Sequence, residues 1–378
     1  MPTKTTAKST STGRRRPAHK RACPPAPAVR GTDWELKLGD ALYQLKKLPT
    51  NSVHAVVTDP PYAYNGGIYG QAWDRQSAAH TARFWQEVLR VLRPGGHVLA
   101  FAAANTYHRL ATALEESGFE LRDQFMWLRG HGRGAASLGD QVAAAGGDAE
   151  QWSGWVSNIR PGHEPIAVAR KPLEGSLADN LVKWRTGGLN SEACRSPITT
   201  KKAGRSTTVP GRRPSTVVIG PEAAAVVDQQ SGYSRSRHNP KASASRPSWH
   251  SGSISTNRGA RGYDDEGGAA RFFYNARAVG AERRFGLPKG VEAHETTKPL
   301  ELMRWLVRMV TPPAGPDGEP AGVVLDPFAG SGSTGGAALM EGFRFVGFER
   351  HREHARRARW RLRAWEQRAA DERAAPGL

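Results

Sequence analysis

Short apolar runs and amphipathic segments alternate in the first half of the chain. Residues 53–58 (VHAVVT) and 97–102 (HVLAFA) are nearly continuous apolar runs, which are typical of strands buried on both faces. Between them, Phe84, Val88 and Leu92 recur at helical spacing, and the Arg-Pro-Gly-Gly sequence that follows is expected to end this helix. A strand, a helix and a second strand in this order predict a βαβ unit.

The same pattern returns towards the end of the chain. Residues 322–326 (GVVLD) and 344–349 (RFVGFE) predict two further buried strands, with the helix of STGGAALMEG between them, and residues 164–172 predict one more strand. A helix with an apolar face is predicted on each side of this second unit. The face before it consists of Leu300, Met303, Leu306, Val307 and Val310, and the face after it consists of Ala355, Ala358, Leu362 and Trp365. The pattern predicts an α/β fold with a doubly wound, mostly parallel sheet.

Two segments lack this periodicity. Residues 1–30 are rich in Ser, Thr, Pro, Ala, Lys and Arg, and we expect a disordered basic tail. Residues 195–262 contain few aromatic residues and one apolar nucleus, STVVIGPEAAAVV, so we expect an irregular insert that is poorly ordered without a partner. The predicted organisation is a tail, a first half of the folded domain at 31–194, the insert, and a second half at 263–378.

The positive charge is concentrated in these two segments. The whole chain has a net charge of +19. Residues 1–30 carry eight Lys and Arg and no acid, and residues 195–262 carry twelve against two acids, which gives 8 + 10 = 18 of that charge. A balanced domain with two basic segments favours a polyanionic partner, nucleic acid before a membrane surface. Solubility and a codon bias towards Arg are the plainer explanations.

Cysteine content and hydropathy exclude several classes of protein. Cys23 and Cys194 are too few for a disulfide framework or a zinc site, and no His cluster has ligand spacing, so we expect no metal site. The longest apolar run, residues 98–104, is too short to cross a bilayer, and the N-terminus has no apolar signal-peptide core. We expect a soluble protein of a reducing compartment.

A glycine-rich turn follows the strand GVVLD. Gly330, Gly332 and Gly335 fit the G-x-G-x-x-G spacing between a strand and a helix, where glycines let a ligand approach a helix N-terminus closely. Glu349 ends the next strand, where a carboxylate can hold ribose hydroxyls. No Lys follows the glycines, so the turn is not a P-loop. The spacing predicts a nucleoside cofactor, and a dehydrogenase remains possible on this feature alone.

A second loop, Asp-Pro-Pro-Tyr at residues 59–62, follows the strand VHAVVT. A strand-ending turn is its plainest interpretation. Because ligands of doubly wound sheets bind outside the carboxyl ends of the strands, we expect this loop and the glycine-rich turn to face one crevice.

The two motifs in this order, with the segment HETTKPLELMRWLVRMVTPP before the second, resemble the beta class of DNA amino-methyltransferases. The resemblance covers residues 33–190 and 271–365 and extends to methylases of phages and prophages. Glu295 departs from it, because the family usually has proline there.

The resemblance implies a site-specific enzyme that methylates an exocyclic amine in double-stranded DNA, as in restriction-modification. The methyl donor would be S-adenosylmethionine. The implied catalytic residues are Asp59 and the Pro60 carbonyl, which accept hydrogen bonds from the target amine, Pro61, which stiffens the loop, and Tyr62, on which a flipped-out base stacks. The implied donor-binding residues are Phe328, Gly330 and Gly332 around the donor, Glu349 at its ribose, Asp40 near its adenine, Lys298 near its methionine end, and Asp326, which either contacts the donor or fixes the loop. The insert would be the target-recognition region.

Several alternatives remain open on the sequence. The 6-amino group of adenine is the favoured target because Asp begins the loop, and the 4-amino group of cytosine is the alternative. An RNA methyltransferase, a catalytically dead DNA-binding protein and a nicotinamide-dependent oxidoreductase are others. The sequence does not distinguish a monomer from a dimer.

Overall fold

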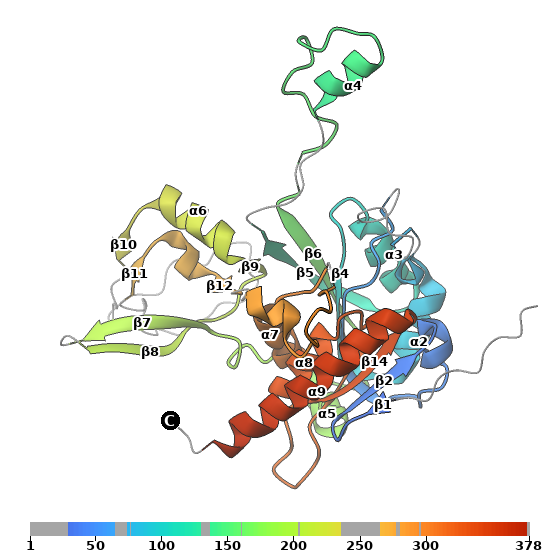
Figure 1. Cartoon of the computed structure of the whole chain (residues 1–378). Helices are drawn as coiled ribbons and strands as arrows, with labels where there is room; N and C mark the ends of the chain where they lie inside the picture. Colours follow the sequence, from blue (N-terminus) through green and yellow to red (C-terminus); the bar gives the residue numbers. More distant parts are fainter. Residues whose placement is uncertain are drawn as a thin grey trace, which may run out of the picture.

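A ten-stranded mixed sheet forms the centre of the protein (Figure 1). The computed structural model describes residues 29–64, 74–75, 77–129, 137–159, 161–202, 205–235, 265–276, 280–294 and 296–375. The basic tail, apart from its last two residues, and Glu295 lie outside these ranges. In order across the sheet, the strands are β1 (Val29–Arg30), β2 (Trp34–Leu38), β14 (Arg344–Glu349), β13 (Val323–Asp326), β3 (Val53–Thr58), β4 (Leu92–Phe101), β6 (His163–Arg170), β5 (Glu120–Leu128), β9 (Val217–Ile219) and β12 (Tyr274–Asn275).

The sheet is parallel from β2 to β4, and the predicted doubly wound fold is confirmed. From β13 the chain continues to β14 on one side, whereas from β3 it continues to β4 on the other side. The strand order therefore reverses between β13 and β3, and such a switch point opens a crevice at the carboxyl ends of the strands. The loop at residues 59–62, called the DPPY loop below, follows β3. The loop at residues 328–332, called the glycine loop, follows β13.

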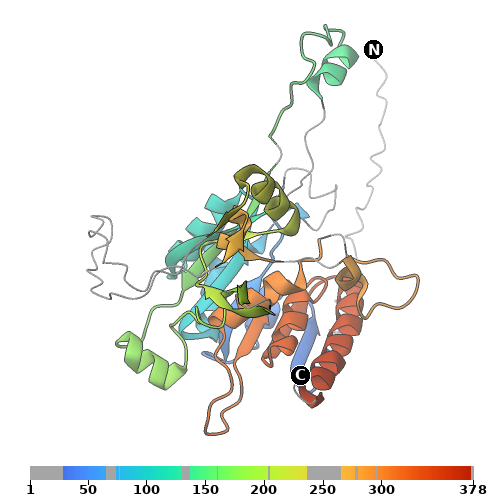
Figure 2. The same cartoon turned by 90° about the vertical axis from the view of Figure 1, so that its left-hand side faces the viewer.

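Two helical layers cover the sheet (Figures 1 and 2). Alternate residues of β3 face them, because Ala55 and Val57 belong to one apolar core and Val56 to the other. The first layer consists of α7 (Leu300–Val310), α8 (Ser333–Met340) and α9 (Arg352–Ala374), and the second of α1 (Ala41–Leu45), α2 (Ala82–Val91) and α3 (Tyr107–Glu116). The predicted faces of α7 and α9 are buried as expected.

Helix α2 is one residue shorter than its apolar spacing predicted. Leu92 was expected on the helix face, but it begins β4 instead, with φ −75° and ψ 140°. Arg93 precedes Pro94, and the residue before a proline disfavours helical backbone. The side chain of Leu92 is still fully buried in the same core as Val88, so the apolar pattern identified its burial correctly.

The insert is more regular than the sequence predicted. The expectation of irregular structure over 195–262 is wrong for the described part of that range. Hairpin β7 (Ser196–Lys202) and β8 (Arg205–Arg212) precedes β9 and α6 (Pro221–Ser231), while short β10 (Ser234–Arg235) pairs with β11 (Glu266–Gly267). The apolar nucleus explains this regular structure, because Val218 and Ile219 are fully buried where β9 joins the central sheet between β5 and β12. Residues 236–264 lie outside the described residues.

Two further helices, α5 and α4, lie outside the two helical layers. Helix α5 (Leu177–Trp184) packs near the start of β4, where the buried Asn180 amide donates to the Pro94 and Thr186 carbonyls. Helix α4 (Leu138–Ala144) lies on a projection between β5 and β6, away from the sheet (Figure 1). Within the described ranges, no helix has the length and apolar character needed to span a membrane.

Candidate active site

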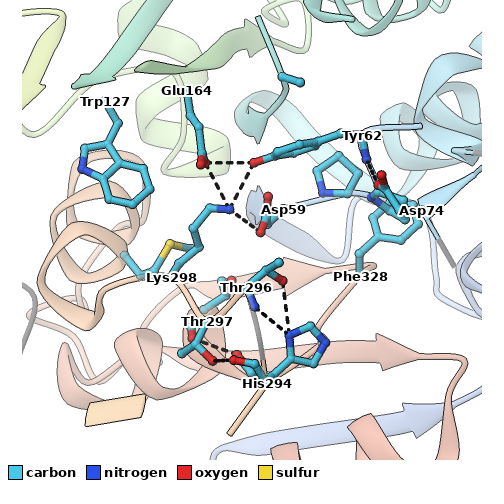
Figure 3. A pocket seen from close by; sticks show the side chains of 18 of the residues that line it. Asp59, Tyr62, Asp74, Trp127, Glu164, His294, Thr296, Thr297, Lys298 and Phe328 are labelled. Carbon is cyan, nitrogen blue, oxygen red and sulfur yellow. Dashed lines mark hydrogen bonds and ion pairs between the residues drawn. The ribbon is translucent and has the colours of Figure 1, made fainter. Parts of the chain in front are cut away.

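A cavity of about 1210 Å³ opens at the switch point of the sheet. The DPPY loop and the glycine loop both line it, as expected for loops at the carboxyl ends of neighbouring parallel strands, and so does Asp40. Glu164 and Lys298 line it as well (Figure 3). Ligand pockets usually measure about 300 to 1,000 Å³. The cavity therefore has room for more than one small molecule, such as a nucleoside donor and a nucleobase.

Asp74 holds the DPPY loop in place. Its buried carboxylate accepts hydrogen bonds from the backbone N–H groups of Tyr62 at 2.6 Å, Ala63 at 3.3 Å and Tyr64 at 3.3 Å. Ala63 has a φ of 53°, so the chain turns sharply directly after Tyr62. Pro60 and Pro61 fix the preceding φ angles. The loop is thus rigid before any ligand binds, and Asp74 was not identified from the sequence.

Asp59 has one occupied and one open carboxylate oxygen. Its Oδ2 atom forms an ion pair with Lys298 Nζ at 2.5 Å. Its Oδ1 atom is buried and has no hydrogen-bond partner among the described residues. Burial raises the pKa of Asp59 more than the Lys298 ammonium lowers it, and Glu164 raises it further. An unpartnered buried acceptor costs free energy, which a ligand that donates a hydrogen bond would recover.

Lys298 and Glu164 connect the DPPY loop to two other parts of the chain. Lys298 Nζ also donates to Tyr62 Oη at 3.1 Å and lies 3.2 Å from Glu164 Oε2. Tyr62 Oη donates to the same Glu164 oxygen at 3.0 Å, and Arg129 pairs with the other. Burial alone would lower the pKa of Lys298, but Asp59 and Glu164 raise it, so its ammonium is charged.

Glu164 was missed as a site residue. Its segment was predicted only as a strand, but Glu164 is the second residue of β6 and lines the cavity with 9% of its surface exposed. Burial alone would raise the pKa of Glu164, yet Lys298 and Arg129 outweigh this effect and hold it below the ordinary value. The available signal was a charged residue at the start of an otherwise apolar strand.

Tyr62 lines the cavity but is itself largely covered. Its exposed fraction is 7%, and its ring meets Tyr64 edge-to-face with centroids 6.0 Å apart. Burial raises the pKa of its hydroxyl well above the ordinary value, so this group is a neutral donor. The base-stacking role that the resemblance implies stays a prediction.

The glycine loop wraps around the carboxylate of Glu349. Gly330 donates its backbone N–H to Glu349 Oε2 at 2.9 Å, and the backbone N–H of His351 donates to Glu349 Oε1 at 2.7 Å. Gly330 and Gly332 have positive φ angles of 49° and 78°, which only glycine adopts readily. A Cβ atom built on Gly330 would lie in open space with Phe328 O at 3.7 Å, so the absence of a side chain leaves room at this turn.

Asp326 lies behind both loops and is not among the residues that line the cavity. Its Oδ1 atom accepts from Thr58 Oγ1 at 2.6 Å and from the Phe328 N–H at 3.0 Å, and its Oδ2 atom accepts from Thr334 Oγ1 at 2.7 Å. Burial raises the pKa of Asp326 to about 6. Of the two roles that the sequence left open, these contacts support fixing the loop, and a direct contact with the donor stays untested.

Asp40 and Phe328 both line the cavity, and their predicted contacts with the donor stay predictions. Asp40 follows β2, caps α1 through the Tyr43 N–H at 3.1 Å, and stays exposed. It neighbours Glu349, because Gly39 donates its N–H to the Glu349 carbonyl at 2.9 Å. The Phe328 ring packs on Phe84 with centroids 5.2 Å apart.

The hydrogen-bond and ion-pair partners of Lys298 belong to the DPPY loop and β6. Its predicted place near the methionine end of the donor stays a prediction. Gly332 shapes the turn without lining the cavity.

These residues fit a nucleoside donor. Asp40 and Glu349 put two carboxylates at one end of the cavity, the glycine loop leaves space for close approach, and Phe328 supplies an apolar wall. His294 and His354 contact each other there with centroids 4.4 Å apart, and burial lowers the pKa of His294 to about 3, so it is neutral. Within the described ranges, no cluster of three or more His, Cys, Asp or Glu side chains could hold a metal ion.

Comparisons with known proteins agree with this geometry. The model of a DNA methylase family matches residues 53–359. Type II methyltransferase M.HindIII of Haemophilus influenzae is 31% identical over 201 residues, which are 41% of this chain and 64% of that protein. Putative methylase YubD of Escherichia coli is 41% identical over 75 residues, which are 20% of this chain and 30% of that protein. The matches thus span less than two thirds of each curated relative.

Solved structures are more distant in sequence. The PvuII DNA methyltransferase, described as cytosine-N4-specific, is 16% identical with a TM-score of 0.48, and the alignment covers 90% of this chain and 91% of that one. The complex of M1.HpyAVI with SAM is also 16% identical, with a TM-score of 0.42 and coverage of 87% and 98%.

Proposed function

Because the chain belongs to the DNA methylase family, we propose that it transfers a methyl group from S-adenosylmethionine to an exocyclic amino group of a base in double-stranded DNA. One observation carries this proposal. The buried Oδ1 atom of Asp59 has no hydrogen-bond partner among the described residues, and it belongs to the cavity that the glycine loop and Glu349 also line. An acceptor and a nucleoside-binding loop in one cavity fit the transfer of a group from a nucleoside donor to an amine.

The chain's own residues prepare the amine. The lone pair of an exocyclic amine is delocalised into the ring, and acceptors for both of its protons favour the pyramidal, more nucleophilic nitrogen. Asp59 Oδ1 supplies one acceptor and the Pro60 carbonyl the other. The rigid loop holds both in place before the substrate arrives, which reduces the entropy cost of alignment. The donor, when bound, supplies an activated methyl group for direct transfer.

The donor is held at the other end of the cavity. Glu349 and Asp40 supply carboxylates for hydroxyl and amino groups, and the backbone turn at Gly330 gives the donor room. Phe328, whose ring packs on Phe84 of α2, would supply an apolar contact for the donor. These contacts lie on different loops from Asp59, so binding of the donor and activation of the amine depend on separate residues.

We propose adenine as the target and its 6-amino group as the acceptor of the methyl group. The DPPY loop begins with Asp, whereas many cytosine enzymes that this chain resembles begin the loop with Ser. A carboxylate is the stronger hydrogen-bond acceptor. The 4-amino group of cytosine is the second candidate, because it also presents two protons on a ring-conjugated nitrogen and would use the same acceptors.

Duplex DNA is the proposed partner. The net charge of +19 favours phosphate contacts, and eight of the positive charges lie in residues 1–30. The insert at 195–262 has a net charge of +10 (twelve Lys and Arg against two acids) and is the proposed target-recognition region. Enzymes that modify bacterial DNA work in the cytoplasm, so the proposal places the chain there.

Sequencing that detects modified bases, applied to DNA from cells that express the protein, tests the activity and reveals the recognised site. Digestion of the same DNA to nucleosides and mass spectrometry identify the base. We expect N6-methyladenine at one defined sequence. If N4-methylcytosine is the sole product, cytosine and not adenine is the target base. If the DNA stays unmodified although the protein binds the donor normally, the proposed activity is wrong.

A further inference from the structure

Three separate segments meet at one ammonium group. Lys298 Nζ has three protons and three acceptors within reach: Asp59 Oδ2 at 2.5 Å, Tyr62 Oη at 3.1 Å and Glu164 Oε2 at 3.2 Å. The ammonium is thereby saturated, and its position is fixed from three directions. Only 9% of the Lys298 side chain is exposed, so water does not replace these partners readily.

Glu164 completes the arrangement. One of its oxygens accepts from the Tyr62 hydroxyl and the Lys298 ammonium (Figure 3). The other pairs with Arg129. Among the buried polar atoms of Asp59, Tyr62, Glu164 and Lys298, Asp59 Oδ1 alone has no hydrogen-bond partner within the part of the chain that the structure describes. A network with one open acceptor directs a donated hydrogen bond to that atom alone.

We propose that Glu164 is a positioning residue for methyl transfer, which anchors Lys298 and the Tyr62 hydroxyl so that Asp59 presents Oδ1 to the target amine. The inference rests on the proposed function and adds a residue on β6 to it. Without the Glu164 charge, Asp59 is the one carboxylate among the described residues that still pairs with Lys298, and the Tyr62 hydroxyl loses its charged acceptor. Both changes disturb the acceptor and the stacking surface without touching the donor end of the cavity.

The first experiment compares Glu164→Gln with the wild type in single-turnover transfer from labelled S-adenosylmethionine to duplex DNA. Misplaced reacting groups cost about 10²-fold in rate, and we expect a loss of that size. Binding of S-adenosylmethionine, measured by calorimetry, should stay within about 3-fold because Glu164 has no contact with the glycine loop or Glu349. A parallel loss of binding and rate would assign Glu164 a structural role and overturn the proposal.

The pH profile gives an independent readout. The negative charge of Glu164 raises the pKa of Asp59, so Glu164→Gln should move the acid limb of the rate profile to lower pH. The other ionisable and charged groups around this network are Tyr62, Tyr64, Asp74, Arg129, His294, Lys298 and Asp326, and the variant leaves all of them in place. If the acid limb of the Glu164→Gln profile stays at the wild-type pH and its transfer rate is also normal, the proposal is wrong.

Glu120→Gln is the matched control. Glu120 lies on the neighbouring strand β5 and pairs with Arg170 of β6 at 2.6 Å, outside the cavity. The Glu120→Gln variant should have the transfer rate and the pH profile of the wild type. If Glu164→Gln does not fold, Tyr62→Phe is tested instead, because it removes only the Tyr62 hydroxyl and with it the hydrogen bond to Glu164. A transfer rate of this variant within 2-fold of the wild type would overturn the inference. A wild-type enzyme without transfer activity would instead contradict the proposed function.

Discussion

The DPPY loop and the glycine loop leave adjacent strands at the same edge of the sheet, but different contacts hold them. Asp326 and Glu349 hold the glycine loop from the ends of β13 and β14, and both oxygens of each carboxylate accept hydrogen bonds. Lys298, which precedes α7, and Asp74 hold the DPPY loop, and Asp59 keeps one oxygen open. The first arrangement suits binding of a donor molecule, and the second suits a chemical step on an amine.

The Asp59→Ala variant should distinguish the roles of the two loops most clearly, because it should affect the transfer rate and not donor binding. The open acceptor is lost, so the single-turnover rate of methyl transfer should fall by about 10³-fold or more. The affinity for S-adenosylmethionine should change by only a few-fold, because among the described residues no hydrogen bond or ion pair joins Asp59 to the glycine loop. Quenched-flow kinetics and calorimetry measure the two quantities. A complete loss of donor binding would show that the DPPY loop is structural.

Glu349→Gln should give the opposite pattern. Loss of a charged acceptor for the donor weakens binding by about 10- to 100-fold, which corresponds to a charge-assisted hydrogen bond of about 1.5–3 kcal/mol. At saturating donor the transfer rate should stay within a few-fold. An unchanged dissociation constant would remove Glu349 from the donor site.

Thr58→Val breaks the contact between the two strands at their carboxyl ends. The buried Thr58 hydroxyl donates to Asp326, and its loss should lower the free energy of unfolding by about 1.5–2.5 kcal/mol. Thr311→Val is the control. Thr311 is also buried, but its hydroxyl has no hydrogen-bond partner among the described residues, so we expect no loss of stability. Urea titration distinguishes the variants, and equal losses would contradict the role of the Thr58–Asp326 bond.

His54 connects the opposite ends of the same strands, and its effect should be the smallest. Its Nδ1 atom accepts from the Val323 N–H at 3.0 Å, and burial lowers its pKa to about 3. The unfolded chain binds the proton below pH 6.5 and the folded chain does not, so stability falls as the pH decreases from 6.5 towards 3. At pH 5.5 the loss is about 1.4 kcal/mol. His54→Asn should reduce this dependence, and an identical pH profile would contradict it.

The sequence predicted the parts of the molecule that local patterns encode. The βαβ spacing gave the parallel strands β3, β4, β13 and β14, and the motifs placed both loops at one crevice. Strand β5 was missed because polar residues such as Arg122 and Asp123 interrupt its apolar positions. Glu164 and Asp74 were missed because their roles depend on contacts across 102 and 12 residues of chain, which no local pattern records.

A crystal structure with S-adenosylhomocysteine and duplex DNA that contains the recognised site tests the central claim most directly. We predict that the target base lies outside the helix, with its exocyclic amine about 2.7–3.2 Å from Asp59 Oδ1, and that the nucleoside contacts Glu349. A target base that remains stacked in the duplex, or an amine that contacts other residues while Asp59 Oδ1 stays unpartnered, would contradict the account.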